Sequence, residues 1–273
     1  MAVVQRTERL TPHLVRLVLG GDDLADLRAE HADSYVKLCF PRPGVVYDEP
    51  FDVARVRAER PRAEWPVQRT YTLRAVDPSR GEAVVDVVVH GDEGVAGPWA
   101  AAARPGDTVV LLGPGGAYTP DPAAPWHLLA GDESALPAIA ASLERVPAGA
   151  TAVAVVEVAD PGEQLDLSCP GDLHLTWVYR RPEADPELLL TAVREAVADA
   201  GPPAGAPHAF LHGEADSVRA VRRWARTELG VPRELLSASG YWRRGRTEDG
   251  WRTEKAEWAS ATEADDAAAP AGV

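Results

Sequence analysis

The pattern of apolar positions changes character near Thr119. Before that point, short apolar runs alternate with Gly, Pro and Asp, and they cover residues 14–19, 35–40, 68–75, 84–90 and 108–112. Short strands at this spacing predict a small antiparallel barrel. The charged residues 55–64 contain few apolar positions, which predicts an exposed loop between two strands.

After Thr119, strand-like runs alternate with helical patterns. Strands are expected over 126–130, 151–158, 173–179, 209–212 and 235–239, and helices over 134–145, 187–200 and 216–229. This alternation is typical of a parallel sheet with βαβ connections. In the last helix, apolar residues at helical spacing predict one buried face, made of Val218, Val221, Trp224, Ala225 and Leu229.

The prolines of segment 120–125 favour a linker, so the chain is expected to divide there. The predicted division is a barrel domain over residues 1–122 and an α/β domain over 123–258, which includes a C-terminal segment. Residues 259–273 are rich in Ala, Glu and Asp and lack large apolar side chains. That composition predicts a disordered tail.

Composition narrows the classes of function. The 28 Lys+Arg and 42 Asp+Glu residues give a net charge of −14, which argues against nucleic acid or an anionic membrane surface as the main partner. Two cysteines, Cys39 and Cys169, are too few for an iron–sulfur cluster or a Cys-rich zinc site, so no bound metal is expected. Neither a signal peptide nor a run of about 18 apolar residues is seen, which predicts a cytoplasmic protein without membrane insertion.

The strand-like segment 69–74 reads Arg-Thr-Tyr-Thr-Leu-Arg. Alternation along a strand places Arg69 and Tyr71 on one face. The tyrosine ring could then stack on a planar ligand while the guanidinium holds the phosphate of that ligand. An Arg-x-Tyr pair on a strand is also common as a purely structural feature, and the pair alone favours that second interpretation.

In its context, Arg-x-Tyr-Thr-x-Arg resembles the flavin-binding signature of the siderophore-interacting proteins. These FAD-binding ferric-siderophore reductases are a branch of the ferredoxin-NADP reductase superfamily. Other segments resemble motifs of the same family, in the same order: 88–91, 94–100, 104–107 and 113–116 resemble its pyrophosphate-binding turn and the strand behind it, 131–139 its nucleotide-domain signature, and 240–245 its C-terminal motif. The resemblance implies an antiparallel flavin-binding barrel followed by a parallel-sheet nucleotide-binding domain.

The resemblance also implies which residues bind noncovalent FAD and the nicotinamide nucleotide. They are Arg69, Tyr71, Thr72, His90, Gly91, Ala96, Gly97, Trp99, Asp132, Glu133, Ser134, Arg180, Tyr241 and Trp242. Glycines near 91–97 would leave backbone amides open to a pyrophosphate, with a helix beginning near residues 98–99. Structural alternatives stand beside these roles: His90 as a strand-end residue, and Asp132 or Ser134 as a helix cap.

The implied reaction passes a hydride from NADPH or NADH to the flavin and single electrons from the flavin to Fe(III) in a siderophore. No catalytic side chain is assigned. An anionic ferric siderophore is expected near Lys37, Arg243 and Arg244, because an acidic chain must concentrate positive charge locally. Lys255 and Trp258 are expected at the same opening, and the alternative for Lys37 is a solvent-facing strand lysine.

Two other functions remain open at this stage. One is a flavin reductase or electron-transfer partner with another acceptor or donor, such as ferredoxin. The other is a nonenzymatic siderophore-binding protein for iron release, in which the flavin is incidental. Turnover with several acceptors distinguishes the first alternative from a ferric-siderophore reductase. Bleaching of the flavin by NAD(P)H distinguishes the second from an enzyme.

For the nucleotide, the sequence predicts NADPH in preference to NADH. Arg180 and Arg181 follow directly on the strand 173–179, where guanidiniums could hold a 2′-phosphate. The run from Trp177 to Arg180 resembles the Trp-x-x-Arg pattern of the family. Against this, Glu157 and Asp160 end the neighbouring strand and could bind a free ribose hydroxyl.

Overall fold

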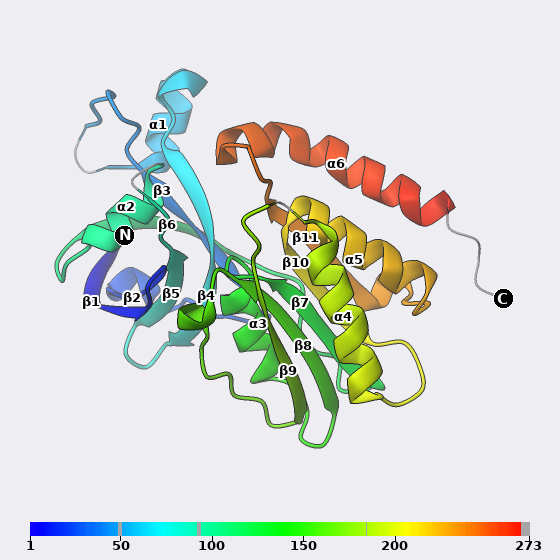
Figure 1. Cartoon of the computed structure of the whole chain (residues 1–273). Coiled ribbons are helices and arrows are strands. Elements are labelled where there is room, and N and C mark those ends of the chain that lie inside the picture. Colours follow the sequence, from blue (N-terminus) through cyan, green and yellow to red (C-terminus); the bar gives the residue numbers. More distant parts are fainter. Residues whose placement is uncertain (49–50, 92–93, 184, 269–273) are drawn as a thin grey trace. The chain divides into compact units, whose positions relative to one another are not determined.

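The computed structural model describes residues 1–48, 51–91, 94–183 and 185–268 (Figure 1), with side chains placed as far as residue 265. The chain splits into two compact units, Met1–Ala117 and Tyr118–Val273. The division falls just ahead of the proline-containing segment 120–125.

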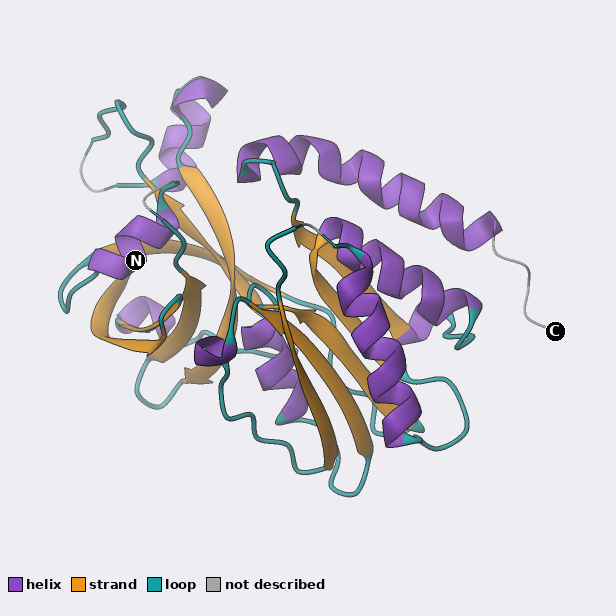
Figure 2. Ribbon diagram, in the orientation of Figure 1, coloured by secondary structure: helices purple, strands orange, loops and turns teal. Residues whose placement is uncertain are grey.

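The first unit is a closed antiparallel barrel, as predicted. Its strands follow one another in the order β1-β2-β5-β4-β3-β6. Their bounds are β1 (Ala2–Thr11), β2 (Leu14–Gly20), β3 (Tyr35–Phe40), β4 (Val67–Asp77), β5 (Glu82–Val88) and β6 (Thr108–Gly115). Figure 2 draws the strands of the protein in orange and its helices in purple. The barrel closes along a short seam in which Ala2 pairs with Val109 and Val3 with Thr108.

The prediction of a loop over residues 55–64 is wrong, because this segment carries α1 (Val53–Glu59) and a 3-10 helix (Arg62–Glu64). The Asp52 carboxylate starts α1 by accepting hydrogen bonds from the backbone amides of Ala54 and Arg55. Val53 and Val56, one turn apart, are buried beneath the charged positions. A second short helix of this unit is α2 (Ala96–Ala102).

The second unit is built on a five-stranded sheet in the order β11-β10-β7-β8-β9. All neighbouring strands are parallel, which confirms the predicted architecture. The strands are β7 (Trp126–Asp132), β8 (Thr151–Val158), β9 (Asp172–Tyr179), β10 (His208–Glu214) and β11 (Leu236–Trp242), and the helices are α3 (Leu136–Leu143), α4 (Glu187–Ala200), α5 (Ala215–Thr227) and α6 (Glu248–Ala268).

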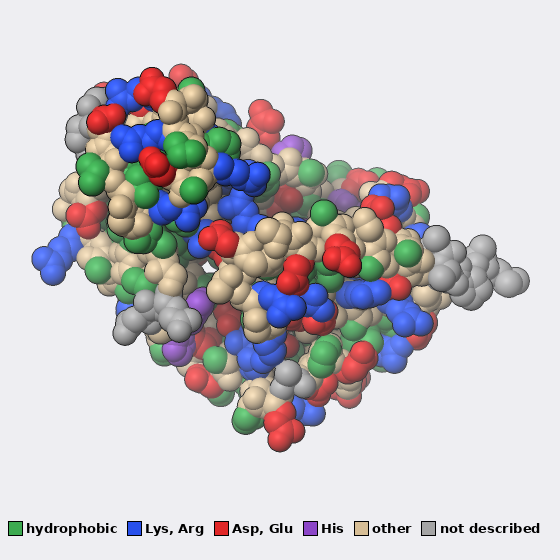
Figure 3. Space-filling model, turned by 90° about the horizontal axis from the view of Figure 1, so that it is seen from above, with side chains coloured by type: hydrophobic (Ala, Val, Ile, Leu, Met, Phe, Trp, Pro, Cys, Tyr) green, Lys and Arg blue, Asp and Glu red, His purple; other side chains and the backbone are tan. Residues whose placement is uncertain are grey.

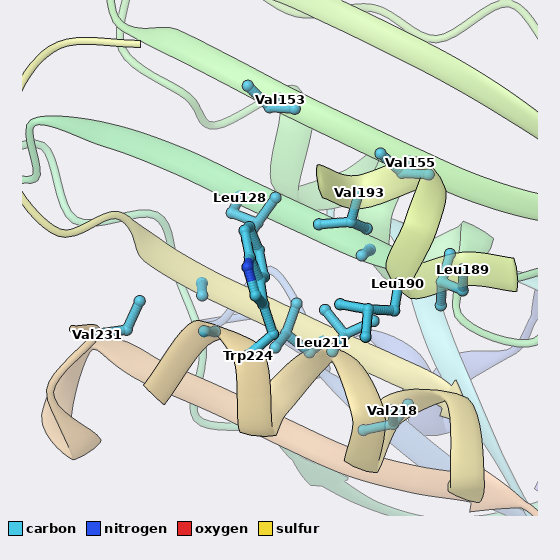
Figure 4. Close-up of a cluster of buried hydrophobic side chains, with 14 of the residues drawn as sticks. Leu128, Val153, Val155, Leu189, Leu190, Val193, Leu211, Val218, Trp224 and Val231 are labelled. Atoms are coloured by element: carbon cyan, nitrogen blue, oxygen red, sulfur yellow. The ribbon is translucent and has the colours of Figure 1, made fainter. Parts of the chain in front are cut away.

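The main core of this unit lies between the sheet and helices α4 and α5. In Figure 4, Trp224 of α5 and Val193 of α4 point toward Leu128 on the sheet. Four residues of the predicted α5 face are buried, namely Val218, Val221, Trp224 and Ala225, whereas Leu229 follows the end of the helix and is half-buried. Apolar spacing therefore identified the packing face of α5 correctly.

The prediction of disorder from residue 259 is wrong as far as Ala268, where α6 ends. Trp251, Trp258 and Thr262 are buried along this helix. Asp265 also pairs with Arg219 of α5 at 2.6 Å. Residues 269–273 lie outside the described residues. No helix in the described part of the chain combines the length and apolarity that a bilayer crossing requires.

Candidate functional site

The predicted flavin-contacting pair lies on β4, where its orientation follows from the pairing with β3. Arg69 lies opposite Leu38, and Tyr71 lies opposite Val36. Because directly opposite residues of an antiparallel pair share a face, Arg69 and Tyr71 project to the same side, as expected. Both side chains are half-buried, and Tyr71 packs against the edge of the barrel core.

Thr72 and Lys37 belong to the other face of these strands. Lys37 pairs with Thr70, and the buried Thr72 pairs with Tyr35. Thr72 therefore faces away from Arg69 and Tyr71 within the strand. The three residues of the Arg-x-Tyr-Thr motif are adjacent, but they present functional groups to two sides of β4.

A second group of predicted FAD residues follows the end of β5. The His90 side chain is exposed and makes no hydrogen bond to a described residue. Gly91 and Gly94 have φ angles of 56° and 84°, which favour glycine at both positions. Helix α2 begins at Ala96, two residues before the predicted start, and the Trp99 ring meets Phe40 edge-on at 5.3 Å between centroids.

In the second unit, the Asp132 carboxylate joins the carboxyl ends of three strands. Oδ1 accepts hydrogen bonds from the amide of Ser134 at 2.9 Å and from its hydroxyl at 2.5 Å. Oδ2 accepts from the amide of Glu214 at 2.7 Å and from the indole Nε1 of Trp242 at 2.8 Å. Burial, and next the neighbouring Glu133, raise the pKa of Asp132 to about 6.

Glu214 is a contributor that the sequence analysis missed. One carboxylate oxygen accepts hydrogen bonds from the amides of Asp216 and Ser217 and so caps α5, while the other accepts from the amide of Arg244. Its position two residues before the helix predicted over 216–229 was the available signal. Asp132 and Glu214 together fix the segment that holds the predicted residues Tyr241 and Trp242.

Arg180, predicted to bind a nucleotide, donates hydrogen bonds to two carboxylates. Its Nη1 and Nη2 donate to the two oxygens of Glu133, and Nε donates to Glu157 at 2.9 Å. Burial disfavours the charged guanidinium, but the bonds to Glu133 and Glu157 outweigh it and raise the pKa of Arg180. Arg181 is exposed and pairs with Asp185.

The four cations predicted to bind the siderophore differ in how well their charges are compensated. Arg243 lies 3.3 Å from Asp216 and 3.6 Å from Glu254. By contrast, the side chains of Lys37, Arg244 and Lys255 form no ion pair with any described residue. The Arg244 guanidinium lies 6.0 Å from the centroid of the Trp242 ring, and burial lowers the pKa of Lys255.

Metal ligands do not gather within the described residues, where no group of at least three His, Cys, Asp or Glu side chains is placed to hold an ion.

Two family profiles match this chain. "Siderophore-interacting FAD-binding domain" matches residues 3–118, and "Siderophore-interacting protein" matches residues 124–245. The two profiles divide the chain close to where the two units divide, and the second profile ends before α6.

Curated relatives extend over nearly the whole chain. An uncharacterised protein of Mycobacterium tuberculosis is 46% identical and the match covers 94% of this chain and 95% of the relative. Ferric vibriobactin reductase ViuB of Vibrio cholerae is 33% identical over 92% of this chain and 91% of its own. The NADPH-dependent ferric-chelate reductase of Escherichia coli is 29% identical over 88% and 91%, respectively.

Among solved structures, the siderophore-interacting protein SipS of Aeromonas hydrophila is similar with a TM-score of 0.77 and 28% identity. The alignment covers 95% of this chain and 97% of SipS. More distant similarities include a ferredoxin reductase of carbazole 1,9a-dioxygenase, at a TM-score of 0.60 and 16% identity, which concerns the fold alone.

Proposed function

Because the chain belongs to the siderophore-interacting protein family, we propose that it is an FAD-dependent oxidoreductase that transfers electrons from NAD(P)H to the Fe(III) of a siderophore. The observation that carries the proposal is the placement of Arg69 and Tyr71 on one face of β4, inside the region that matches the FAD-binding profile. The name of the Vibrio cholerae relative supports ferric siderophore as the acceptor. The cytoplasmic location predicted from the sequence remains a prediction.

The residues of the barrel fit an FAD. The guanidinium of Arg69 and the ring of Tyr71 project from one face of β4. Both side chains are half-buried, so part of each is accessible. Gly91 and Gly94 adopt positive φ angles between β5 and α2, and glycines leave backbone amides accessible. In this proposal Arg69 holds a phosphate of FAD and Tyr71 stacks on its planar ring.

Bound FAD would supply the step from a two-electron donor to a one-electron acceptor. The protein's own contribution is positioning. Asp132 and Glu214 hold the Tyr241–Trp242 segment by the hydrogen bonds described above, and Asp132 fixes Ser134 at the start of the loop before α3. Ser134, Tyr241 and Trp242 are then kept in place to contact the nucleotide and flavin, as the resemblance implies.

In this proposal the ferric siderophore is attracted by basic side chains that form no ion pair with a carboxylate. On the face that Figure 3 shows, basic side chains are interspersed with acidic ones. Lys37, Arg244 and Lys255 form no ion pair with any described residue, a property that they share with exposed arginines such as Arg9 and Arg62. Arg243 is a weaker candidate, since Asp216 and Glu254 offset its charge. Gain of one electron reduces the Fe(III) to Fe(II), which hard oxygen donors bind more weakly.

Anaerobic visible spectroscopy on the purified protein tests the proposal. NADH or NADPH should bleach the bound flavin, and a ferric catecholate or hydroxamate should restore the colour while a ferrous-specific chelator traps Fe(II). Without bleaching, the protein is a nonenzymatic siderophore-binding protein instead. If bleaching occurs but Fe(II) appears no faster than with buffer, while free flavin or ferredoxin turns over, the acceptor is wrong.

A further inference from the structure

An ion-pair cluster at the carboxyl ends of β7, β8 and β9 contradicts the reason for expecting NADPH. Glu133 follows β7, Glu157 is the penultimate residue of β8, and Arg180 follows β9. The parallel register places Asp132 beside Glu157 and Glu157 beside Val178, so the three side chains meet at one edge of the sheet. Nucleotides bind at this edge in open α/β sheets.

Arg180 has little capacity left for a phosphate. Its three nitrogens all donate to carboxylates, two of them in a bidentate pair with Glu133, and its side chain is only 22% exposed. Two N–H groups remain on Nη1 and Nη2, but a 2′-phosphate that used them would lie against the carboxylates of Glu133 and Glu157. Displacing either carboxylate would leave it largely buried without its counter-ion. The second arginine, Arg181, already pairs with Asp185.

The cluster is also negative as a whole. Glu133 and Glu157 bring two carboxylates against one guanidinium, and Asp160 lies three residues beyond Glu157. A dianionic 2′-phosphate would therefore be repelled at this edge, whereas a neutral hydroxyl would not.

Glu157 has an acceptor that suits such a hydroxyl. Its side chain is 8% exposed, and Oε1 accepts the bond from Arg180. Oε2 accepts no hydrogen bond from a described residue. A carboxylate near the end of the strand that follows the first βα unit is the group that binds a free ribose 2′-hydroxyl in dinucleotide sites.

We propose that Glu157, oriented by Arg180, selects a nicotinamide nucleotide with a free 2′-hydroxyl, so that the donor is NADH in preference to NADPH. Arg180 is then a positioning residue and does not bind the nucleotide phosphate. The inference rests on the proposed reductase function, and it reverses the nucleotide predicted from the sequence. It also distinguishes this chain from its Escherichia coli relative, which is named as NADPH-dependent.

Redox-inert ligands test the selection separately from electron transfer. ADP-ribose and 2′-phospho-ADP-ribose are titrated into the holoprotein by calorimetry at low ionic strength, and ADP-ribose should bind at least about tenfold more tightly. Glu157→Gln keeps an acceptor for Arg180 but removes one negative charge, and it should bring the two affinities within about threefold of each other. Glu183→Gln, at an exposed position three residues after Arg180, is the matched control and should leave the ratio unchanged.

The double variant Glu133→Gln, Glu157→Gln releases Arg180 from both charges and should invert the preference. Stopped-flow reduction of the flavin by NADH and NADPH should follow the binding ratios in the wild type and in each variant. Equal or tighter binding of 2′-phospho-ADP-ribose by the wild type overturns the inference, as does a ratio that Glu157→Gln leaves unaltered. If those results occur while either nucleotide still bleaches the flavin, the reductase proposal stands; if neither nucleotide binds or bleaches, both proposals fail.

Discussion

Arg69 carries the clearest prediction for a single residue. Arg69→Ala should lose most of the FAD while the barrel stays folded, because a charge-assisted bond to a phosphate contributes about 1.5–3 kcal/mol. The flavin-to-protein absorbance ratio after gel filtration measures the loss, and circular dichroism checks the fold. Arg80→Ala is the control, since Arg80 lies in the turn between β4 and β5 and pairs with Glu82 on the surface. Full FAD occupancy in Arg69→Ala would show that the assignment is wrong.

Two buried histidines connect stability to pH. His127 is fully buried, and neither ring nitrogen has a hydrogen-bond partner among the described residues. Burial lowers the pKa of His127 from 6.5 to about 4. Burial, and next the charge of Lys255, lower the pKa of His212 to about 3. Both imidazoles are therefore neutral in the folded protein near neutral pH.

The direction of the pH effect follows from where protons bind first. Below about pH 6.5 the two histidines bind protons in the unfolded state but stay neutral in the folded state. The free energy of unfolding therefore decreases as the pH is lowered. Asp132 opposes this effect: its pKa is raised from 3.8 to about 6, so the folded state takes up that proton first between those values. The two histidines outweigh the one carboxyl group.

His127→Leu isolates one histidine from this balance. When the pH is lowered from 7 to 5, the free energy of unfolding should fall in both proteins, but the fall should be about 2 kcal/mol smaller in His127→Leu than in the wild type, because the ionisable group is gone. Urea unfolding at the two pH values measures the difference. Val153→Ala alters packing on the adjacent β8 without removing an ionisable group, and should lower stability equally at both pH values. Identical pH dependence of His127→Leu and the wild type would contradict the explanation.

For single residues, the sequence predicts those features that depend only on residues nearby in the chain. Side chains alternate between the two faces of a strand, so the strand alone was enough to predict that Arg69 and Tyr71 share one face. The sequence did not predict the bonds of Arg180, because Glu133 and Glu157 precede it by 47 and 23 residues. Those three residues meet only through the order of β7, β8 and β9 in the sheet.

Among the elements, α6 gives the most direct test of a corrected prediction. A chain that ends at Ala259 loses the buried Thr262 and the ion pairs of Asp265 with Arg219 and of Glu263 with Arg233. Its free energy of unfolding should fall by about 1–2 kcal/mol, from lost burial and two partly exposed ion pairs. Denaturant unfolding measures the change. A chain that ends at Ala268 keeps the described helix and serves as the control; equal stability of the two truncated chains would favour disorder instead.

Helices α1 and α6, which were predicted as a loop and as a disordered tail, show that composition alone does not identify a helix. In α1 the apolar positions are few, but Val53 and Val56 lie one turn apart and are buried, and Asp52 caps the start. In α6, alanine and glutamate are strong helix formers, and Thr262 replaces the large apolar residue that the sequence analysis required. Helix α5 was predicted correctly because its apolar face is continuous.

At the scale of the whole molecule, the net charge of −14 makes each uncompensated cation important for attracting an anion. Lys37→Glu should raise the apparent KM for an anionic ferric siderophore by about tenfold at low salt, and the difference should shrink as salt screens the charges. The flavin spectrum should stay unchanged. Arg62→Glu, at an exposed position in the 3-10 helix Arg62–Glu64, controls for overall charge. A KM that is unaltered at low salt would refute the role of Lys37.

The architecture of both units was predicted from the rhythm of apolar runs, because barrels and βαβ sheets differ in how their strands are spaced. Strand order was not predictable in the same way. That β7 lies between β10 and β8, and that Asp132 therefore reaches both Glu214 and Trp242, depends on crossovers that leave no local mark in the sequence.

The short seam of the barrel has a consequence for motion on the timescale of amide hydrogen exchange. Two residue pairs join β1 to β6, extended by backbone bonds between Val4 and residues 106–107, whereas β2 and β5 are joined by seven pairs. The shorter ladder should open without global unfolding. Deuterium uptake at residues 2–4 and 106–109 should therefore precede uptake at residues 14–20, and the reverse order would mean that the barrel opens elsewhere.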